Sequence, residues 1–262
     1  MNLSLQGKRA LVCGSTQGIG KASAIELAAA GASVTLMARN ADLLQKTVNH
    51  LPVVPGTVHH FLVADFHLPE EVKAVAETFI HETGPVHILV NNTGGPAGGP
   101  IMAAKTEEFL QAFNNHLICN HILARAVMEG MKVSHYGRII NIISTSVKQP
   151  LKGLGVSNTI RAAVAGWSKT LAGELAPFDI TVNNVLPGAT DTARLSSLIE
   201  AKSLKTGKTI EDLRRDMLEE IPAGRFAHAG EIAAAVAFLA SPAAAYITGI
   251  NLPVDGGRTG CL

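Results

Sequence analysis

The stretch CGSTQGIG at residues 13–20 decides the fold of this chain of 262 residues. It follows a short apolar run and leads directly into a segment with helical spacing. Glycines at these positions permit a tight turn, a close approach of the backbone to a pyrophosphate, and close packing of the helix on the strand. The phosphates would then lie on backbone amides at the helix N-terminus. A glycine loop in this context predicts a dinucleotide site formed by Gly14, Ser15, Thr16, Gln17, Gly18, Ile19 and Gly20.

Outward from the loop, short apolar runs alternate with longer stretches of helical spacing. This alternation predicts one α/β domain over residues 1–262: a doubly wound Rossmann fold with a seven-stranded parallel sheet flanked by helices. Most of the strands are unbroken apolar runs, as expected where helices cover both faces of the sheet. We expect strands at 9–13, 33–38, 59–64, 86–91, 138–143, 181–186 and 250–254. Helices are expected at 19–30, 42–50, 70–82, 107–132, 158–176 and 231–240.

Residues 194–225 interrupt this rhythm with a charged segment rich in Lys and Glu. An insertion after a late strand is typical of a lid over a substrate pocket. A pair of solvated surface helices explains the same composition equally well.

Composition excludes several classes of function. Hydrophobic residues make up 47% and the formal net charge is +1, so nothing indicates a nucleic-acid or anionic-membrane partner. The three cysteines, Cys13, Cys119 and Cys261, have wide and irregular spacing, which fits neither a disulfide framework nor a metal site. A reducing, cytoplasmic setting is therefore expected.

The uncharged stretch at residues 232–250 raises the question of a membrane span. It contains Pro242 and many weakly apolar alanines. Two elements separated at Pro242 therefore explain it better than a membrane helix.

Several further motifs follow the glycine loop in a fixed order. Residues 91–94 read NNTG, Pro187 and Gly188 are followed by Thr192, and the C-terminal part runs from IPAGR at 221–225 through YITG at 246–249 to DGG at 255–257. With these motifs, nearly the whole chain resembles the short-chain dehydrogenase/reductase family, and its C-terminal part is similar to the 3-oxoacyl-(acyl-carrier-protein) reductase branch. The resemblance implies that the cofactor also contacts Asp65, Phe66, Asn92, Thr93, Gly94, Pro187, Gly188 and Thr192.

The end of the second expected strand indicates the cofactor. A free ribose 2'-hydroxyl favours a carboxylate about 20 residues after the glycine motif, whereas a 2'-phosphate favours an arginine. Here Ala38 takes the carboxylate position and Arg39 and Asn40 follow. We therefore expect NADP(H) rather than NAD(H), with an exposed strand-end arginine as the structural alternative.

The catalytic pattern departs from the one that the family implies, which is a Tyr donor, a Lys four residues later, a Ser and an Asn. Ser144 follows the fifth expected strand, but the Tyr and Lys positions hold Ser157 and Arg161, and the Asn position holds His116. An aliphatic hydroxyl has no ionisation within reach of neutral pH, so Ser157 cannot simply replace a phenol as acid. Arg161 stays charged and is expected to bind the nicotinamide ribose, but it cannot exchange a proton.

Two residues are candidates for the missing acid. His116 shares a helical stripe with apolar residues, so it points inward, and a packed structural histidine is the alternative. Lys148 lies beyond the fifth strand, at the end of the sheet where such folds bind ligands. A desolvated lysine can act as an acid, and an exposed loop lysine is the alternative.

We therefore expect an oxidoreductase that interconverts a carbonyl and an alcohol, with a non-standard proton donor. Its substrate would be a small or acyl-carrier-linked carbonyl compound, and the resemblance implies a homo-tetramer or homo-dimer. A catalytically inert nucleotide-binding sensor or structural subunit stays open, because Tyr, Lys and Asn are all replaced.

Overall fold

The computed structural model of the chain describes residues 1–261. Seven parallel strands form one sheet in the order β3-β2-β1-β4-β5-β6-β7, which is the doubly wound order expected from the sequence. The strands are β1 (Arg9–Cys13), β2 (Ser33–Ala38), β3 (His60–Val63), β4 (Ile88–Asn91), β5 (Gly137–Ile142), β6 (Ile180–Pro187) and β7 (Asn251–Val254). Pro253 is tolerated in β7 because that strand forms an edge of the sheet.

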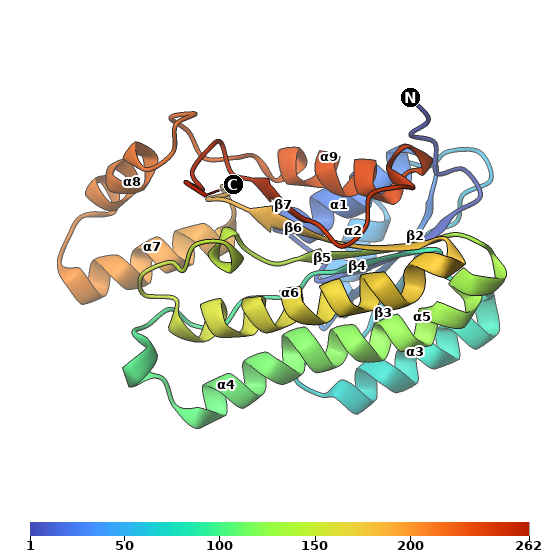
Figure 1. The fold of residues 1–262 in the computed structure, drawn as a ribbon, viewed down its shortest axis with the longest axis horizontal. Coiled ribbons are helices and arrows are strands. Elements are labelled where there is room, and N and C mark those ends of the chain that lie inside the picture. Colours follow the sequence, from blue (N-terminus) through green and yellow to red (C-terminus); the bar gives the residue numbers. More distant parts are fainter. Residues whose placement is uncertain (262) are drawn as a thin grey trace.

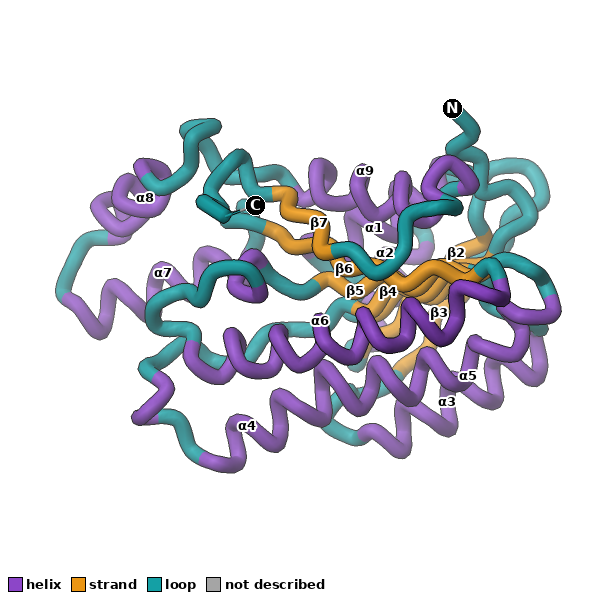
Figure 2. Tube along the Cα trace, in the orientation of Figure 1, coloured by secondary structure: helices purple, strands orange, loops and turns teal. Residues whose placement is uncertain are grey.

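Helices cover both faces of the sheet, so that the molecule has three layers (Figure 1). One face carries α1 (Gly18–Ala29), α2 (Ala41–Val48) and α9 (Ala229–Ala240). The other carries α3 (Pro69–Thr83), α4 (Thr106–Phe113), α5 (Cys119–Val133) and α6 (Gly155–Leu175). The strands lie side by side between these layers and form one twisted sheet (Figure 2). The expected elements are all present, with ends that shift by at most three residues.

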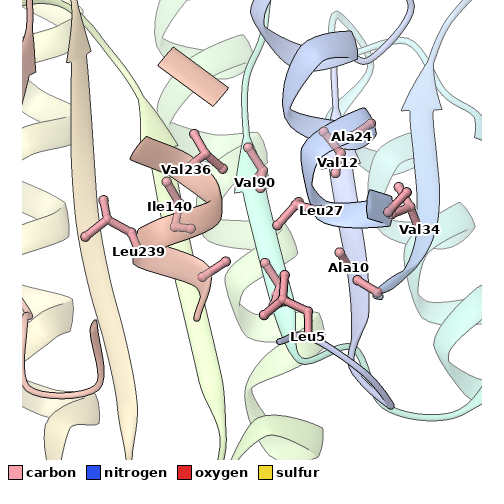
Figure 3. Close-up of a cluster of buried hydrophobic side chains, with 14 of the residues drawn as sticks. Leu5, Ala10, Val12, Ala24, Leu27, Val34, Val90, Ile140, Val236 and Leu239 are labelled. Carbon is pink, nitrogen blue, oxygen red and sulfur yellow. The ribbon is translucent and has the colours of Figure 1, made fainter. Parts of the chain in front are cut away.

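The core beneath α1 and α9 is a continuous apolar cluster (Figure 3). Leu27 of α1 and Leu239 of α9 are fully buried and meet Val12, Val90 and Ile140 from three central strands. Burial of one such side chain contributes about 1.5–3 kcal/mol to folding. These contacts hold the glycine loop, because α1 begins within it at Gly18.

The expected single helix over 107–132 contains a turn of a different kind. Residues Asn114–Ile118 form a π-helical turn between α4 and α5, so one helical stretch is divided into three parts. Such turns insert one extra residue into a helix and are frequent at functional sites. His116 lies in this turn.

A row of asparagines crosses four neighbouring strands on the α6 side of the sheet. Asn91, Asn141, Asn184 and Asn251 are register partners on β4, β5, β6 and β7. Their side chains bond in sequence at 2.8 Å, 3.0 Å and 2.8 Å, and Asn141 also donates to Ser168 of α6 at 2.8 Å. We call this row the asparagine ladder. It pairs polar groups that would be costly to bury alone, although the Asn91 Oδ1 atom has no partner among residues 1–261.

The insertion forms two helices, α7 (Ala193–Thr206) and α8 (Ile210–Glu219), which extend away from the end of the sheet (Figure 1). They share a small apolar cluster with the chain that follows, made by Leu195, Ile199, Leu213, Ile221 and Phe226. A surface helix pair is thus present, and both helices also bury apolar side chains of their own.

The uncharged stretch at 232–250 divides as expected. Helix α9 ends at Ala240, and a 3-10 turn, Pro242–Ala244, follows. Within residues 1–261, no helix is both long and apolar enough to cross a membrane.

Candidate active site

A cavity of about 490 Å³ lies at the carboxyl ends of the central strands. Gly14, Asn92 and Gly188 line it directly after β1, β4 and β6, and Ser144 lines it two residues after the end of β5. Parallel doubly wound sheets bind ligands at this edge. The cavity wall includes these residues from the expected site: Gly14, Gln17, Gly18, Ile19, Asn92, Thr93, Gly94, Ser144, Ser157, Arg161, Pro187, Gly188 and Thr192.

The glycine loop is tightly packed where it meets Asn92. Gly14 and Gly18 have φ of +57° and +55°, a backbone conformation that favours glycine. A Cβ on Gly14 would lie 2.4 Å from the Asn92 carbonyl oxygen, and one on Gly20 would lie 2.3 Å from that of Gly14. The Asn92 amide donates to the Cys13 and Gly14 carbonyls at 3.2 Å and 3.1 Å. The N-terminus of α1 therefore faces the cavity through Gln17, Gly18 and Ile19, where it can hold a pyrophosphate.

The remaining loop residues, Ser15, Thr16 and Gly20, do not line this cavity. Ser15 is fully buried, and its hydroxyl lacks a protein partner among the described residues. Gly20 has a packing role, since any side chain there would strike Gly14.

The residues expected at the adenosine end lie together at the ends of β2 and β3. Arg39 is exposed and close enough to Asp65 for its charge to help lower the pKa of that carboxyl, although a hydrogen bond from the His67 backbone is the larger cause. Asn40 has a structural role, because its side chain caps α2 by accepting from Leu43 N at 2.9 Å. Phe66 is buried in the core on the α3 side. In the described chain, Arg39 takes part in no ion pair, so its guanidinium is free for a phosphate.

Ser144, Ser157 and Arg161 share the far wall of the cavity. The Ser144 hydroxyl accepts from Ser146 N at 3.1 Å, which leaves its own proton to donate. Arg161 is buried on α6 and donates to the Ile142 carbonyl at 2.8 Å, while its Nε has no partner among the described residues. Burial, followed by the charge of Arg194, lowers the pKa of Arg161 to about 10, so it stays charged at neutral pH.

His116 points inward, as its helical stripe indicates, and is only 2% exposed. Its Nδ1 lies 2.5 Å from the Thr93 hydroxyl, and the ring does not reach the cavity wall. Burial, followed by the charges of Arg161 and Arg194, holds the pKa of His116 well below its usual value. At neutral pH the ring is therefore uncharged and is a poor proton donor.

Lys148 ends the 3-10 turn Thr145–Val147 after β5, outside the residues that line the cavity. Neither tyrosine of the chain can supply the missing proton donor at the cavity. Tyr136 donates from its buried hydroxyl to the Ala240 carbonyl at 2.5 Å, and Tyr246 is fully exposed. Both expected substitute donors, Lys148 and His116, thus lie away from the cavity wall.

The structure adds residues that the motifs do not indicate. Arg194 at the start of α7, Arg258 near the C-terminus and Gly95 also line the cavity. Of these, Arg194 could have been found from the sequence, because it lies two residues after Thr192 at the start of the charged insertion. Over residues 1–261, three or more His, Cys, Asp or Glu side chains nowhere gather in a way that could hold a metal ion.

Comparisons with known proteins agree with this geometry. Residues 14–259 match the family model described as enoyl-(acyl carrier protein) reductase. The 3-oxoacyl-(acyl-carrier-protein) reductase of Pseudomonas aeruginosa is 38% identical over 257 residues, covering 97% of this chain and 98% of the relative.

Two solved structures are similar throughout. L-sorbose reductase from Gluconobacter frateurii, in complex with NADPH and L-sorbose, has a TM-score of 0.93 and 33% identity with full coverage of both chains. YwfH, an NADPH-dependent reductase involved in bacilysin biosynthesis, has a TM-score of 0.89 and 29% identity over 97% of this chain and 99% of its own.

Proposed function

The chain belongs to the short-chain dehydrogenase/reductase family, and we propose that it is an NADP(H)-dependent oxidoreductase that interconverts a carbonyl and an alcohol. One observation carries the proposal: a single cavity joins the glycine loop to Ser144, Ser157 and Arg161. The first part of that wall suits a dinucleotide, and the second suits a polar oxygen.

NADP(H) is favoured over NAD(H) by Arg39, which is exposed at the end of β2 where a 2'-phosphate is recognised. The sorbose reductase and YwfH, both similar along their whole length, are described as NADPH proteins. A bound reduced nicotinamide would supply the hydride.

We assign the substrate oxygen to the hydroxyls of Ser144 and Ser157. Each hydroxyl can donate one hydrogen bond to the oxygen as its negative charge develops. Arg161 would bind the ribose hydroxyls and place a fixed positive charge beside this oxygen.

Water that enters the cavity is the proton source that this arrangement leaves. Arginines are the titratable side chains on the described cavity wall, and Arg161 keeps its proton at neutral pH. Loss of a positioned general acid typically lowers the rate by ~10²–10⁴-fold without abolishing it. We therefore expect slow turnover compared with relatives that keep the tyrosine.

The substrate is a carbonyl compound, either small or acyl-carrier-linked, as in the reductases that this chain resembles. Helices α7 and α8 would act as its lid, because Arg194, Leu195, Leu198 and Met217 from them face the cavity. The lack of a neutral-pH acid on the wall favours one second candidate, an inert nucleotide-binding subunit.

Stopped-flow mixing of the protein with NADPH and a panel of ketones and 3-oxoacyl thioesters tests the proposal. We expect consumption of NADPH that falls at least tenfold in Ser144→Ala. The matched control is Ser146→Ala, whose buried hydroxyl has no partner among residues 1–261 and does not face the cavity. Normal NADPH binding without hydride transfer to any compound would overturn the proposal.

The double variant Ser157→Tyr with Arg161→Lys separates the two candidates. It restores the residue types that the family pattern implies. If it reduces a carbonyl that the natural chain leaves untouched, the inert subunit is correct; faster turnover by the natural chain supports the oxidoreductase.

A further inference from the structure

Two arginines converge on one point of the cavity. The Nη2 atoms of Arg194 and Arg161 lie 3.4 Å and 3.7 Å from the place where a Cβ on Gly95 would be. Because residue 95 is a glycine, the space between the two guanidinium groups stays open to the cavity.

Among the described residues, no acidic side chain balances the charges of Arg161 and Arg194. The cavity wall, within the described residues, contains Arg161, Arg194 and Arg258 but no Asp or Glu. Arg258 is paired with Glu220, whereas Arg161 and Arg194 are in no ion pair in the part of the chain that the structure describes. Two like charges side by side with no anion between them destabilise each other.

Both side chains are held in place by backbone carbonyls, so they cannot simply turn outward. Arg161 donates to Ile142 O at 2.8 Å, and Arg194 donates to Pro96 O. Arg161 is only 8% exposed, and its Nε has no partner among residues 1–261. An unpartnered donor at this depth is costly unless a ligand completes it.

A third positive element points to the same place. Arg194 lies in the first turn of α7, whose N-terminal residues Thr192 and Ala193 also line the cavity. The N-terminus of a helix of 14 residues carries a partial positive charge. Two guanidinium forks beside a helix N-terminus suit an oxyanion such as a planar carboxylate.

We infer that the substrate of this reductase carries a free carboxylate, which binds between Arg161 and Arg194 next to Gly95. The substrate class is therefore a small oxo acid or hydroxy acid. This inference rests on the proposed function for the reaction itself, but the anion site can be tested without turnover. The alternative source of the anion is a phosphate of the cofactor.

The probes are five-carbon oxo acids with the ketone at the second, third or fourth carbon, each compared with its neutral amide. Binding is measured by calorimetry with NADP⁺ present, and turnover is followed as NADPH consumption. A charge-assisted pair of hydrogen bonds corresponds to roughly 10–100-fold, so at least one acid should bind and react that much better than its amide.

The variant Arg194→Gln should abolish this preference for the acid while NADPH affinity changes by less than about threefold. The matched control is Arg258→Gln, which removes an arginine from the same cavity that already has an acidic partner. It should retain the ratio of acid to amide.

The outcomes separate this inference from the proposed function. Binding of an acid that depends on Arg194, without turnover, supports the carboxylate site and refutes the reductase. Reduction of ketones with no preference for the acid over the amide refutes the carboxylate site alone. A tenfold loss of NADPH affinity in Arg194→Gln, with the acid preference kept, assigns the arginines to the cofactor and overturns the inference.

Discussion

The asparagine ladder should contribute most to stability at its centre. Asn141 is fully buried and makes three side-chain hydrogen bonds, to Asn91, Ser168 and Asn184. Replacement by alanine leaves the buried Asn91 amide without its acceptor, which costs about 1–3 kcal/mol. Ser168 and Asn184 keep the bond between them at 2.8 Å, so each loses only about 0.5–1.5 kcal/mol.

Asn141→Ala should therefore lower the free energy of unfolding by about 2–6 kcal/mol. Asn251→Ala at the exposed end of the ladder removes one bond of 2.8 Å and leaves the site open to water. We expect it to cost only about 0.5–1.5 kcal/mol.

Equilibrium unfolding in urea, at one fixed protein concentration, measures both values from the midpoint and the slope. The concentration is fixed because any self-association would shift the apparent stability. Equal losses of unfolding free energy in the two variants, or a loss below about 1 kcal/mol for Asn141→Ala, would refute the view that hydrogen bonds between the buried asparagines stabilise the fold.

Three other perturbations give measurable results. Arg39→Ala should weaken NADPH binding by roughly 10–100-fold and leave NADH binding unchanged in fluorescence titrations. If the variant bound NADPH as tightly as the natural chain does, the assignment of Arg39 to the 2'-phosphate would be wrong. Gly20→Ala should lower both the melting temperature and NADPH affinity because its Cβ would meet Gly14 O at 2.3 Å, whereas Gly166→Ala, with open space around it, should not destabilise the fold. Burial, followed by the charges of Lys8 and Arg9, lowers the pKa of His87 to about 4. Between pH 6.5 and 4, His87 is therefore protonated in the unfolded chain but not in the folded chain. Stability should fall as the pH drops through that window, and His87→Gln should reduce the slope of melting temperature against pH; an unchanged slope would count against this cause.

The fold was predictable because most of its strands are mainly apolar and buried under helices on both faces. Short, mainly apolar runs at regular spacing identify the seven strands, and the glycine loop fixes the start of the first βαβ unit. The π-helical turn at Asn114–Ile118 was not predictable, since a stripe with Phe109, Phe113 and Leu117 looks the same on an α-helix.

Some residues of the candidate site were predictable from the sequence and others were not. Residues in ordered motifs, such as Asn92, Ser144 and Thr192, line the cavity as expected. The position of Lys148 relative to the cavity could not be predicted from the sequence, because the turn at Thr145–Val147 sets the direction of the chain after β5. The pairing of Arg161 with Arg194 depends on where α7 begins relative to Gly95, and local sequence carries no such information.

The apolar cluster shared by α7 and α8 has a consequence for how this protein can change over evolution. Leu195, Ile199, Leu213, Ile221 and Phe226 pack with one another and form a cluster separate from the two large cores of the sheet. Segment 193–226 can therefore diverge in sequence with little effect on those two cores, as long as its contacts with residues 256–258 are kept. Because Arg194 belongs to that segment, the carboxylate site that we propose predicts that exchange of the segment also changes the preference between charged and neutral compounds.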